Sequence, residues 1–192
     1  MINEGLMKLI NAHEAWLCGE RHGKQLILRN ADFRGMNLEK VNFSRAELIG
    51  ANFQGACLEK ADFSLANLEE SNFQDSNLYK ADFHEANLRN AVFKNAAMAL
   101  SDLSFANLQG ADLQGANLRN AYIVCACLDK ANLSDSIVVD ANLEHTSLIK
   151  ANLTNTDFER ANLGSVDFTE AYLDGIVSFV GANIRDSNIK RR

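Results

Sequence analysis

An apolar residue occurs at every fifth position through most of this 192-residue chain. The third residue of each five-residue unit is apolar in 29 consecutive units, from Phe33 to Leu173. Ala is the first residue in 20 of these units, and Asp or Asn is the second residue in 20. A period of five fits neither the 3.6 residues of a helical turn nor the two-residue alternation of a strand. A chain that turns a corner once per unit can still keep every apolar residue on its inner side.

A square coil of four units, and therefore of 20 residues, satisfies this pattern. We expect the central apolar residues to point inward and the small first residues to fit the inner corners. The short Asp or Asn side chain is expected to bond its own turn. Successive coils are expected to pair through backbone groups at about 4.8 Å, the usual distance between strands.

Phe and Leu alternate strictly at the unit centres in the first half of the repeat. With 20 residues per coil, Phe side chains stack on two opposite walls and Leu side chains on the other two, which fills a narrow interior without voids. The expected inward core consists of Phe33, Leu38, Phe43, Leu48, Phe53, Leu58, Phe63, Leu68, Phe73, Leu78, Phe83, Leu88 and Phe93. After Phe93 most centres are Leu, so we expect the packing to change midway.

The segment before the repeat has the spacing of an amphipathic helix. Residues 4–18 are expected to form this helix and to cover the first coil. The residues at helical spacing are Leu6, Leu9, Ile10, His13, Trp16 and Leu17.

The register of the repeat shifts once, close to the other end. Phe179, Ile184 and Ile189 serve as unit centres only if one residue is inserted after Leu173. We therefore expect a bulge or a wider corner at 174–181. No apolar helix follows to cover the last coil, and an open sheet edge favours association. The sequence thus predicts a homodimer that stacks end to end through the carboxyl-terminal end.

The unit A(D/N)(L/F)xx resembles the repeat of the pentapeptide repeat family, and the resemblance extends from residue 26 to about residue 190. It implies an all-β solenoid, namely a right-handed quadrilateral β-helix with a short N-terminal α-helical cap. We accordingly expect a helical cap at 1–25 and a β-helix at 26–192. The resemblance indicates fold more than function, because the repeat is a scaffold on which family members do different things.

Motifs for catalysis, nucleotide binding and metal binding are missing from the sequence. It contains no GxxxxGK(S/T), GxSxG, HExxH or GxGxxG. The four Cys residues have neither the paired spacing of a zinc site nor the density of a disulfide scaffold. Cys125 and Cys127 lie on adjacent sides of the coil, which favours packing over a shared metal. We expect no catalytic residue, no cofactor and no metal.

The expected cellular location follows from the lack of a membrane helix and of a secretory signal in the sequence. No window reaches the roughly 18 uninterrupted apolar residues of a membrane helix. The first residues also lack a basic stretch followed by a long apolar run. We expect a cytoplasmic protein that does not bind membranes.

The middle of the rod is acidic, whereas its ends are slightly basic. Residues 31–175 contain 21 acidic and 11 basic residues. A negative rod repels nucleic acid and attracts basic protein grooves, including those that hold DNA. We therefore expect protein partners and no direct binding of nucleic acid.

Two groups of outward apolar residues are expected near the middle of the rod. Such groups often mark a partner site, although scattered surface residues are the alternative. One group contains Tyr79, Ala97, Ala99, Leu100, Ile137 and Val139, and the other contains Leu65, Phe105, Tyr122, Val124 and Cys125. Asp62, Asp82 and Asp102 are also expected to stack in one column of like charges. Each of these carboxylates either bonds its own turn or requires a cation or partner.

Two functions fit these features. The first is a non-catalytic protein-interaction scaffold that presents an acidic, rod-shaped surface to an unknown partner. The second is implied by the resemblance, because quinolone-resistance members of the family act as DNA mimics. The chain would then bind a type II topoisomerase, DNA gyrase or topoisomerase IV, and modulate it or protect it from quinolones. The uninterrupted register leaves no room for the projecting loops that many topoisomerase-protecting members carry. The candidate partner surface is Asp157, Glu159, Asp167, Glu170, Phe105, Tyr122 and Val124.

Overall fold

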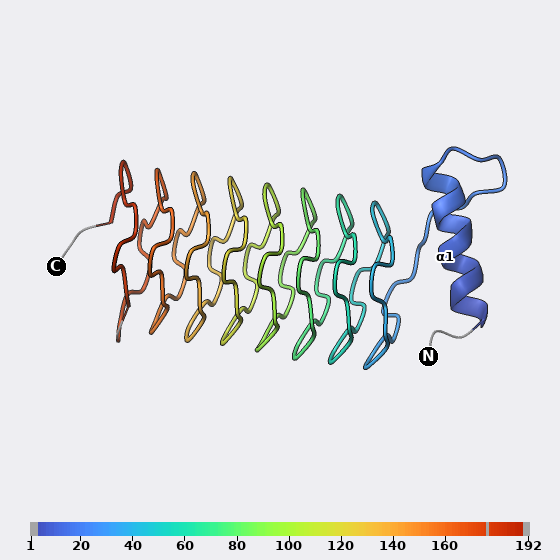
Figure 1. The fold of residues 1–192 in the computed structure, drawn as a ribbon, viewed down its shortest axis with the longest axis horizontal. Coiled ribbons are helices and arrows are strands. Elements are labelled where there is room, and N and C mark those ends of the chain that lie inside the picture. The colour runs from blue at the N-terminus through green and yellow to red at the C-terminus, as the bar shows by residue number, and fades with distance from the viewer. Residues whose placement is uncertain (1–3, 176, 190–192) are drawn as a thin grey trace.

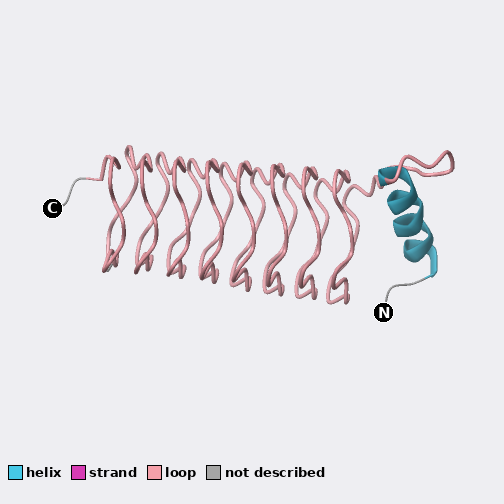
Figure 2. Cartoon of the chain, turned by 45° about the horizontal axis from the view of Figure 1, so that its top comes forward, coloured by secondary structure: helices cyan, strands magenta, loops and turns pink. Residues whose placement is uncertain are grey.

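The computed structural model describes residues 4–175 and 177–189. Helix α1 spans Glu4–Leu17, and a stack of coils follows it (Figure 1). Within the described residues the stack has no strand longer than one residue, and Figure 2 accordingly shows it as loops and turns. Isolated parallel bridges instead join residues 20 apart, from Ile27–Glu47 to Asn152–Tyr172. Each coil therefore takes four units, as the five-residue period predicts.

Each coil has four sides, which we number by their unit centres. Side 1 contains Phe33, side 2 Leu38, side 3 Phe43 and side 4 Leu48, and residues 20 apart lie on the same side. Neighbouring coils are joined by backbone hydrogen bonds. On side 1, for example, the Phe33 N–H donates to the carbonyl of Asn52 (N···O 2.7 Å), and the Asn52 N–H donates to the carbonyl of Ala31 (2.8 Å). Proline has no N–H to give to such a ladder, and the sequence contains none.

The corners of the coil are turns that end in a residue with positive φ. The fifth residue of each unit has this conformation, with φ near 60° even for Lys40 and Leu65. Side chains disfavour it because Cβ approaches the following carbonyl oxygen. The second residue of the unit supports the turn, since Asp62 Oδ1 accepts the N–H of Ser64 at 2.9 Å. The expected bonding of Asp or Asn to its own turn thus occurs at the corners.

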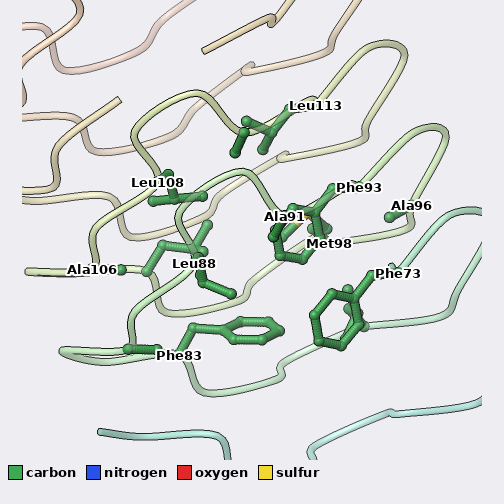
Figure 3. Packing of buried hydrophobic residues seen from close by; sticks show 14 of the residues in the cluster. Phe73, Phe83, Leu88, Ala91, Phe93, Ala96, Met98, Ala106, Leu108 and Leu113 are labelled. Carbon is green, nitrogen blue, oxygen red and sulfur yellow. The ribbon is translucent and has the colours of Figure 1, made fainter. Parts of the chain in front are cut away.

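Two interlocking stacks of Phe rings fill the first half of the interior. The thirteen residues of the expected core from Phe33 to Phe93 are at most 2 % exposed. Rings one coil apart are stacked with centroids 4.7–5.1 Å apart. Between the two stacks most rings meet edge to face, with centroids 5.5–6.0 Å apart. The stacked and the edge-to-face arrangements are both favourable geometries for aromatic pairs. Figure 3 shows Phe73, Phe83 and Phe93 in this packing.

Helix α1 lies at the amino-terminal end of the stack and packs against the first coil (Figure 1). Leu6 and Ile10 belong to the same buried cluster as the coil interior. His13 is fully buried, its Nδ1 accepts the N–H of Leu26 at 3.0 Å, and its Nε2 lies 2.9 Å from the carbonyl oxygen of Ser44. The imidazole therefore joins the helix to the chain entering the stack and to the first coil. Among the described residues, no helix has the length and apolarity needed to cross a bilayer.

The last coil is spaced differently, and residues 177–189 do not close the interior at this end. The bridge offset changes from 20 to 21 residues at Asp157–Ser178 and Asn162–Asn183. One additional residue therefore lies between Tyr172 and Ser178. A hollow of about 900 Å³ opens at this end, and its half-buried apolar lining includes Leu173, Val177, Phe179, Ile184 and Ile189.

One buried hydroxyl in the stack has no partner, and we expect its removal to stabilise the protein. In the described part of the chain, Ser136 Oγ is the one buried side-chain polar atom without a hydrogen bond. On the same side, Ser76 donates its hydroxyl to the carbonyl of Phe73 at 2.7 Å. The equivalent carbonyl for Ser136 is that of Leu133, which accepts the hydroxyl of Thr156 at 2.9 Å. Ser136→Ala is expected to raise the free energy of unfolding in urea by about 1 kcal/mol.

Ser76→Ala is the matched control for this substitution. It removes a hydroxyl that is bonded, and we expect it to lower the free energy of unfolding by about 1 kcal/mol. Equal losses in the two variants would show that the Ser136 hydroxyl has a partner after all.

Candidate functional site

Side 3 carries the exposed aromatic side chains of the middle coils. Phe105 and Tyr122 are 55 % and 54 % exposed, and Leu65 is 43 % exposed. Backbone hydrogen bonds join their coils, with the Phe105 N–H donating to the carbonyl of Val124 at 2.9 Å. The ring of His84 meets the ring of Phe105 edge on, with centroids 5.4 Å apart. We call this group, Leu65, His84, Phe105, Tyr122 and Val124, the aromatic face.

Two members of the aromatic face have a backbone conformation that their side chains disfavour. Leu65 and Phe105 occupy fifth positions of their units, with φ of 59° and 60°. A side chain in this region costs roughly 1–2 kcal/mol. Phe105 is also largely exposed, so burial in the core offsets little of that cost. This strain was not predicted from the sequence, where its signal is an apolar residue at a position that Gly, Asn, Asp, Lys or Glu occupies in most units.

Phe105→Asn is therefore expected to leave the fold as stable as before or to raise the free energy of unfolding by up to about 1 kcal/mol. Asn adopts positive φ more readily than Phe, and the aromatic contact that the variant loses is the edge contact with His84. Urea denaturation followed by circular dichroism measures the difference. A loss of more than about 1 kcal/mol would mean that Phe105 is part of the stabilising core.

A column of three carboxylates lies beside the aromatic face. Parallel bridges join Asp62 to Asp82 and Asp82 to Asp102 on consecutive coils. In each, Oδ1 accepts the backbone N–H two residues later, at 2.8–2.9 Å. Within the described residues, none of the three forms an ion pair at 4.0 Å or less. Burial raises the pKa of Asp82, and the charges of Asp62 and Asp102 raise it further. The backbone hydrogen bond from His84 and the charge of its imidazole oppose this rise.

The four acidic residues of the predicted partner surface are separated by the structure. Asp157 and Glu159 lie on side 2, whereas Asp167 and Glu170 lie on the opposite side 4. Their charges are also locally paired or bonded. Glu159 pairs with Arg160, and the Glu170 carboxylate lies 3.4 Å from Lys150 Nζ.

Asp167 is bonded from two directions, and its environment favours the ionised form. The hydroxyl and N–H of Thr169 donate to its Oδ1 at 2.6 and 2.9 Å, and the side-chain amide of Asn188 donates at 2.6 Å. These bonds lower the pKa of Asp167. In contrast to these acidic residues, Phe105, Tyr122 and Val124 do lie together on side 3.

The apolar group predicted on side 2 is smaller than the sequence suggests. Val139 is only 2 % exposed, so its assignment to the surface is wrong. It occupies the fourth position of its unit, where short side chains such as Ser104 and Ser134 are also buried. Lys80 Nζ lies 5.4 Å from the centre of the Tyr79 ring. Side 2 therefore offers less free apolar surface than side 3.

The part of the chain that the structure describes has no candidate metal-binding site. No group of three or more His, Cys, Asp or Glu side chains there could hold a metal ion. All four cysteines are free, with Cys125 exposed and Cys127 half-buried. The aromatic face and the carboxylate column beside it are the candidate functional site.

Comparison with known proteins identifies the repeat. A family model described as pentapeptide repeats matches residues 27–64 and 139–175, with 8 copies. A second model, described as pentapeptide repeat region, matches residues 48–123. No curated protein sequence matches the chain significantly.

Two solved structures of one protein show the same fold. Full-length QnrB1, a plasmid-mediated fluoroquinolone resistance protein, superposes with a TM-score of 0.61 at 20 % identity, over 86 % of this chain and 92 % of QnrB1. A trypsin-treated variant of QnrB1 gives the same TM-score and identity over 87 % and 92 %. The comparison also finds HetL, a pentapeptide repeat protein involved in heterocyst differentiation regulation from the cyanobacterium Nostoc, over 97 % of this chain and 94 % of HetL at 23 % identity, with a TM-score of 0.33. The matched residues make up more than half of the chain, which therefore belongs to the pentapeptide repeat family.

Proposed function

We propose that the chain is a non-catalytic protein-interaction scaffold that binds its partner through the aromatic face of side 3. The observation that carries this proposal is the exposure of Phe105 and Tyr122 together on consecutive coils. Aromatic side chains are enriched at the centres of protein interfaces, where they supply much of the binding energy. The type of residue at position 105 also supports the proposal, because all units share the positive φ but most of them have Gly, Asn, Asp, Lys or Glu at this position.

The rigidity of the coil stack also favours binding of a partner. Backbone hydrogen bonds hold each coil to its neighbours, and the packed interior lies directly below side 3. A partner would meet a surface whose backbone is already ordered, so little conformational entropy is lost on association.

Site-specific photo-crosslinking in the native cell tests the proposal. A photoreactive phenylalanine analogue at position 105 or 122 is expected to capture one partner species. The matched control is position 95, which is Asn95 in the chain, an exposed fifth-position residue half a coil away from Phe105. Replacement of Phe105 and Tyr122 by Ser is expected to abolish association without unfolding the rod. Identical products from positions 105 and 95, or unfolding of the Ser variant, would contradict the proposal.

DNA mimicry at a type II topoisomerase is the second candidate. It is favoured by the acidic surplus of residues 31–175 and by the fold shared with QnrB1, a fluoroquinolone resistance protein. The placement of Asp157 and Asp167 on opposite sides would let a basic groove contact charges on two walls of the rod.

A DNA gyrase supercoiling assay, with and without a quinolone, tests this second candidate. Charge reversal at Asp157, Glu159 and Asp167 is expected to weaken any inhibition and its sensitivity to salt. Inhibition that is unchanged by the reversal would exclude an electrostatic mimic.

The two ends of the rod are proposed to have different roles. Helix α1 is proposed to cap the first coil, and the open carboxyl-terminal end is proposed to stack on a second copy in a homodimer. The apolar hollow and the 69 % exposure of Val180 support the second role. Light scattering is expected to show a dimer that Val180→Lys dissociates. A single monomeric species at high protein concentration would contradict the dimer.

The right-handed sense of the coil stays a prediction from the family resemblance.

A further inference from the structure

The aromatic face is bordered by the carboxylate column, and the two are joined through shared coils. Tyr122 continues the column itself, because a parallel bridge joins it to Asp102. His84 follows Asp82 by two residues and donates its backbone N–H to that carboxylate at 2.8 Å. Its ring in turn contacts Phe105. The aromatic face and the carboxylate column thus lie on the same side of the rod.

The carboxylates of this column retain acceptor capacity for a partner. Asp82 and Asp102 each use Oδ1 for their own turns. No hydrogen bond to Oδ2 of either residue is formed within the described residues. Carboxylate oxygens can each accept more than one hydrogen bond. Because Leu65 and Val124 lie close by and lower the local polarity, an added cation would interact more strongly here than in open solvent.

We infer that side 3 binds a protein segment that presents arginine side chains, with the guanidinium group between the aromatic rings of Phe105 and Tyr122 and the carboxylates of Asp82 and Asp102. This inference rests on the proposed protein-binding function and adds the chemistry of the partner. A guanidinium group stacks on aromatic rings and also donates two parallel hydrogen bonds to a carboxylate. An ammonium group is more strongly hydrated and cannot match that fork. The negative column excludes nucleic acid and acidic segments by repulsion.

Peptide probes distinguish arginine recognition from charge attraction alone. Oligo-arginine and oligo-lysine peptides of equal length, labelled with a neutral dye, are titrated with the full chain at fixed ionic strength and followed by fluorescence anisotropy. Oligo-arginine is expected to bind about tenfold more tightly than oligo-lysine. Tyr122→Asn and Phe105→Asn are expected to abolish this difference. Asp102→Asn is expected to weaken the binding of both peptides.

Matched controls lie on the opposite side of the rod. Tyr172→Asn replaces an exposed tyrosine at the same position of its unit on side 1 and should leave the preference for arginine unchanged. Asp75→Asn removes an exposed carboxylate elsewhere with the same change in net charge. Equal affinity for both peptides, or equal losses in the side 3 and control variants, would overturn the assignment.

The outcomes also separate this inference from the protein-binding role itself. A native partner that is cross-linked at position 105 but is not displaced by oligo-arginine would support protein binding and overturn arginine recognition. Selective binding of oligo-arginine without any cross-linked partner would support the surface chemistry and overturn the proposed role in the cell.

Discussion

Phe73→Ala is expected to lower the free energy of unfolding by about 4 kcal/mol, near the upper end of buried substitutions. The Phe73 ring stacks on the rings of Phe53 and Phe93, with centroids 4.8 and 4.9 Å away. It also meets Phe63 and Phe83 edge to face, at 5.6 Å each. The side chain is fully buried, and the backbone ladder fixes the spacing of the coils on either side. The wall therefore cannot collapse into the cavity that the substitution creates, and the full loss is retained.

Leu153→Ala, on the same side in the second half of the rod, is the control for Phe73→Ala. Leu153 is equally buried but has no aromatic ring to stack on others, and we expect its loss to be about 3 kcal/mol. Unfolding in urea is followed by far-UV circular dichroism and by the fluorescence of Trp16, the one tryptophan of the chain. Equal losses in the two variants would show that the interlocked rings add nothing beyond their buried area.

The same experiment tests how the coils cooperate. In a solenoid each repeat contacts only its neighbours, so stability is distributed along the rod. Phe73→Ala weakens the half of the rod that is nearer to Trp16, and the fluorescence transition should therefore precede the circular dichroism transition. In Leu153→Ala the order should reverse, because the weakened coils then lie far from the tryptophan.

The interior of the rod could be predicted from the sequence because every inward unit centre must be an apolar residue. An inward centre admits no polar side chain, so the run from Phe33 to Phe93 identified the core and the length of the coil together. The amphipathic spacing at 4–18 likewise located α1, which the structure places at Glu4–Leu17. Both features follow from a periodicity that many residues share.

The candidate site was less predictable, because it depends on backbone conformation and on individual side chains. The five-residue period does not show that the fifth position has positive φ, so the cost of placing Phe105 there was invisible. The pairing of Glu159 with Arg160 depends on side-chain rotamers, which the repeat pattern of the sequence does not specify. Val139 was assigned to the surface because its position points outward, although a short side chain there is covered by adjacent coils.

Mild acidification is expected to loosen α1 from the first coil through protonation of His13. Because the Leu26 N–H donates to Nδ1, the hydrogen of the neutral ring lies on Nε2 and is donated to the Ser44 carbonyl. A second proton on Nδ1 would face another donor. Burial lowers the pKa of His13 from its usual value of 6.5, although the Ser44 bond and the Glu14 charge oppose this. The unfolded chain therefore binds the proton more readily. The contribution of His13 to stability is complete above pH 6.5 and decreases as the pH falls through the folded-state pKa.

Trp16 reports this change directly, since its ring stacks on that of His13 with centroids 5.6 Å apart. Fluorescence and urea stability are measured between about pH 7.5 and about pH 5.5, the range in which histidine charges. His13→Ala leaves the Leu26 N–H and the Ser44 carbonyl without their partner and should lower stability by about 3 kcal/mol at neutral pH, and its difference from the native chain should shrink as the pH falls.

His13→Gln separates titration from packing. Its amide can still donate to the Ser44 carbonyl but does not titrate in this range. We expect this variant to be somewhat less stable than the native chain at neutral pH and to lose the acid-dependent change in Trp16 fluorescence. If the change persists in His13→Gln, protonation of carboxylates elsewhere must loosen the helix, and the buried imidazole would then be a packing residue without a role in acid sensitivity.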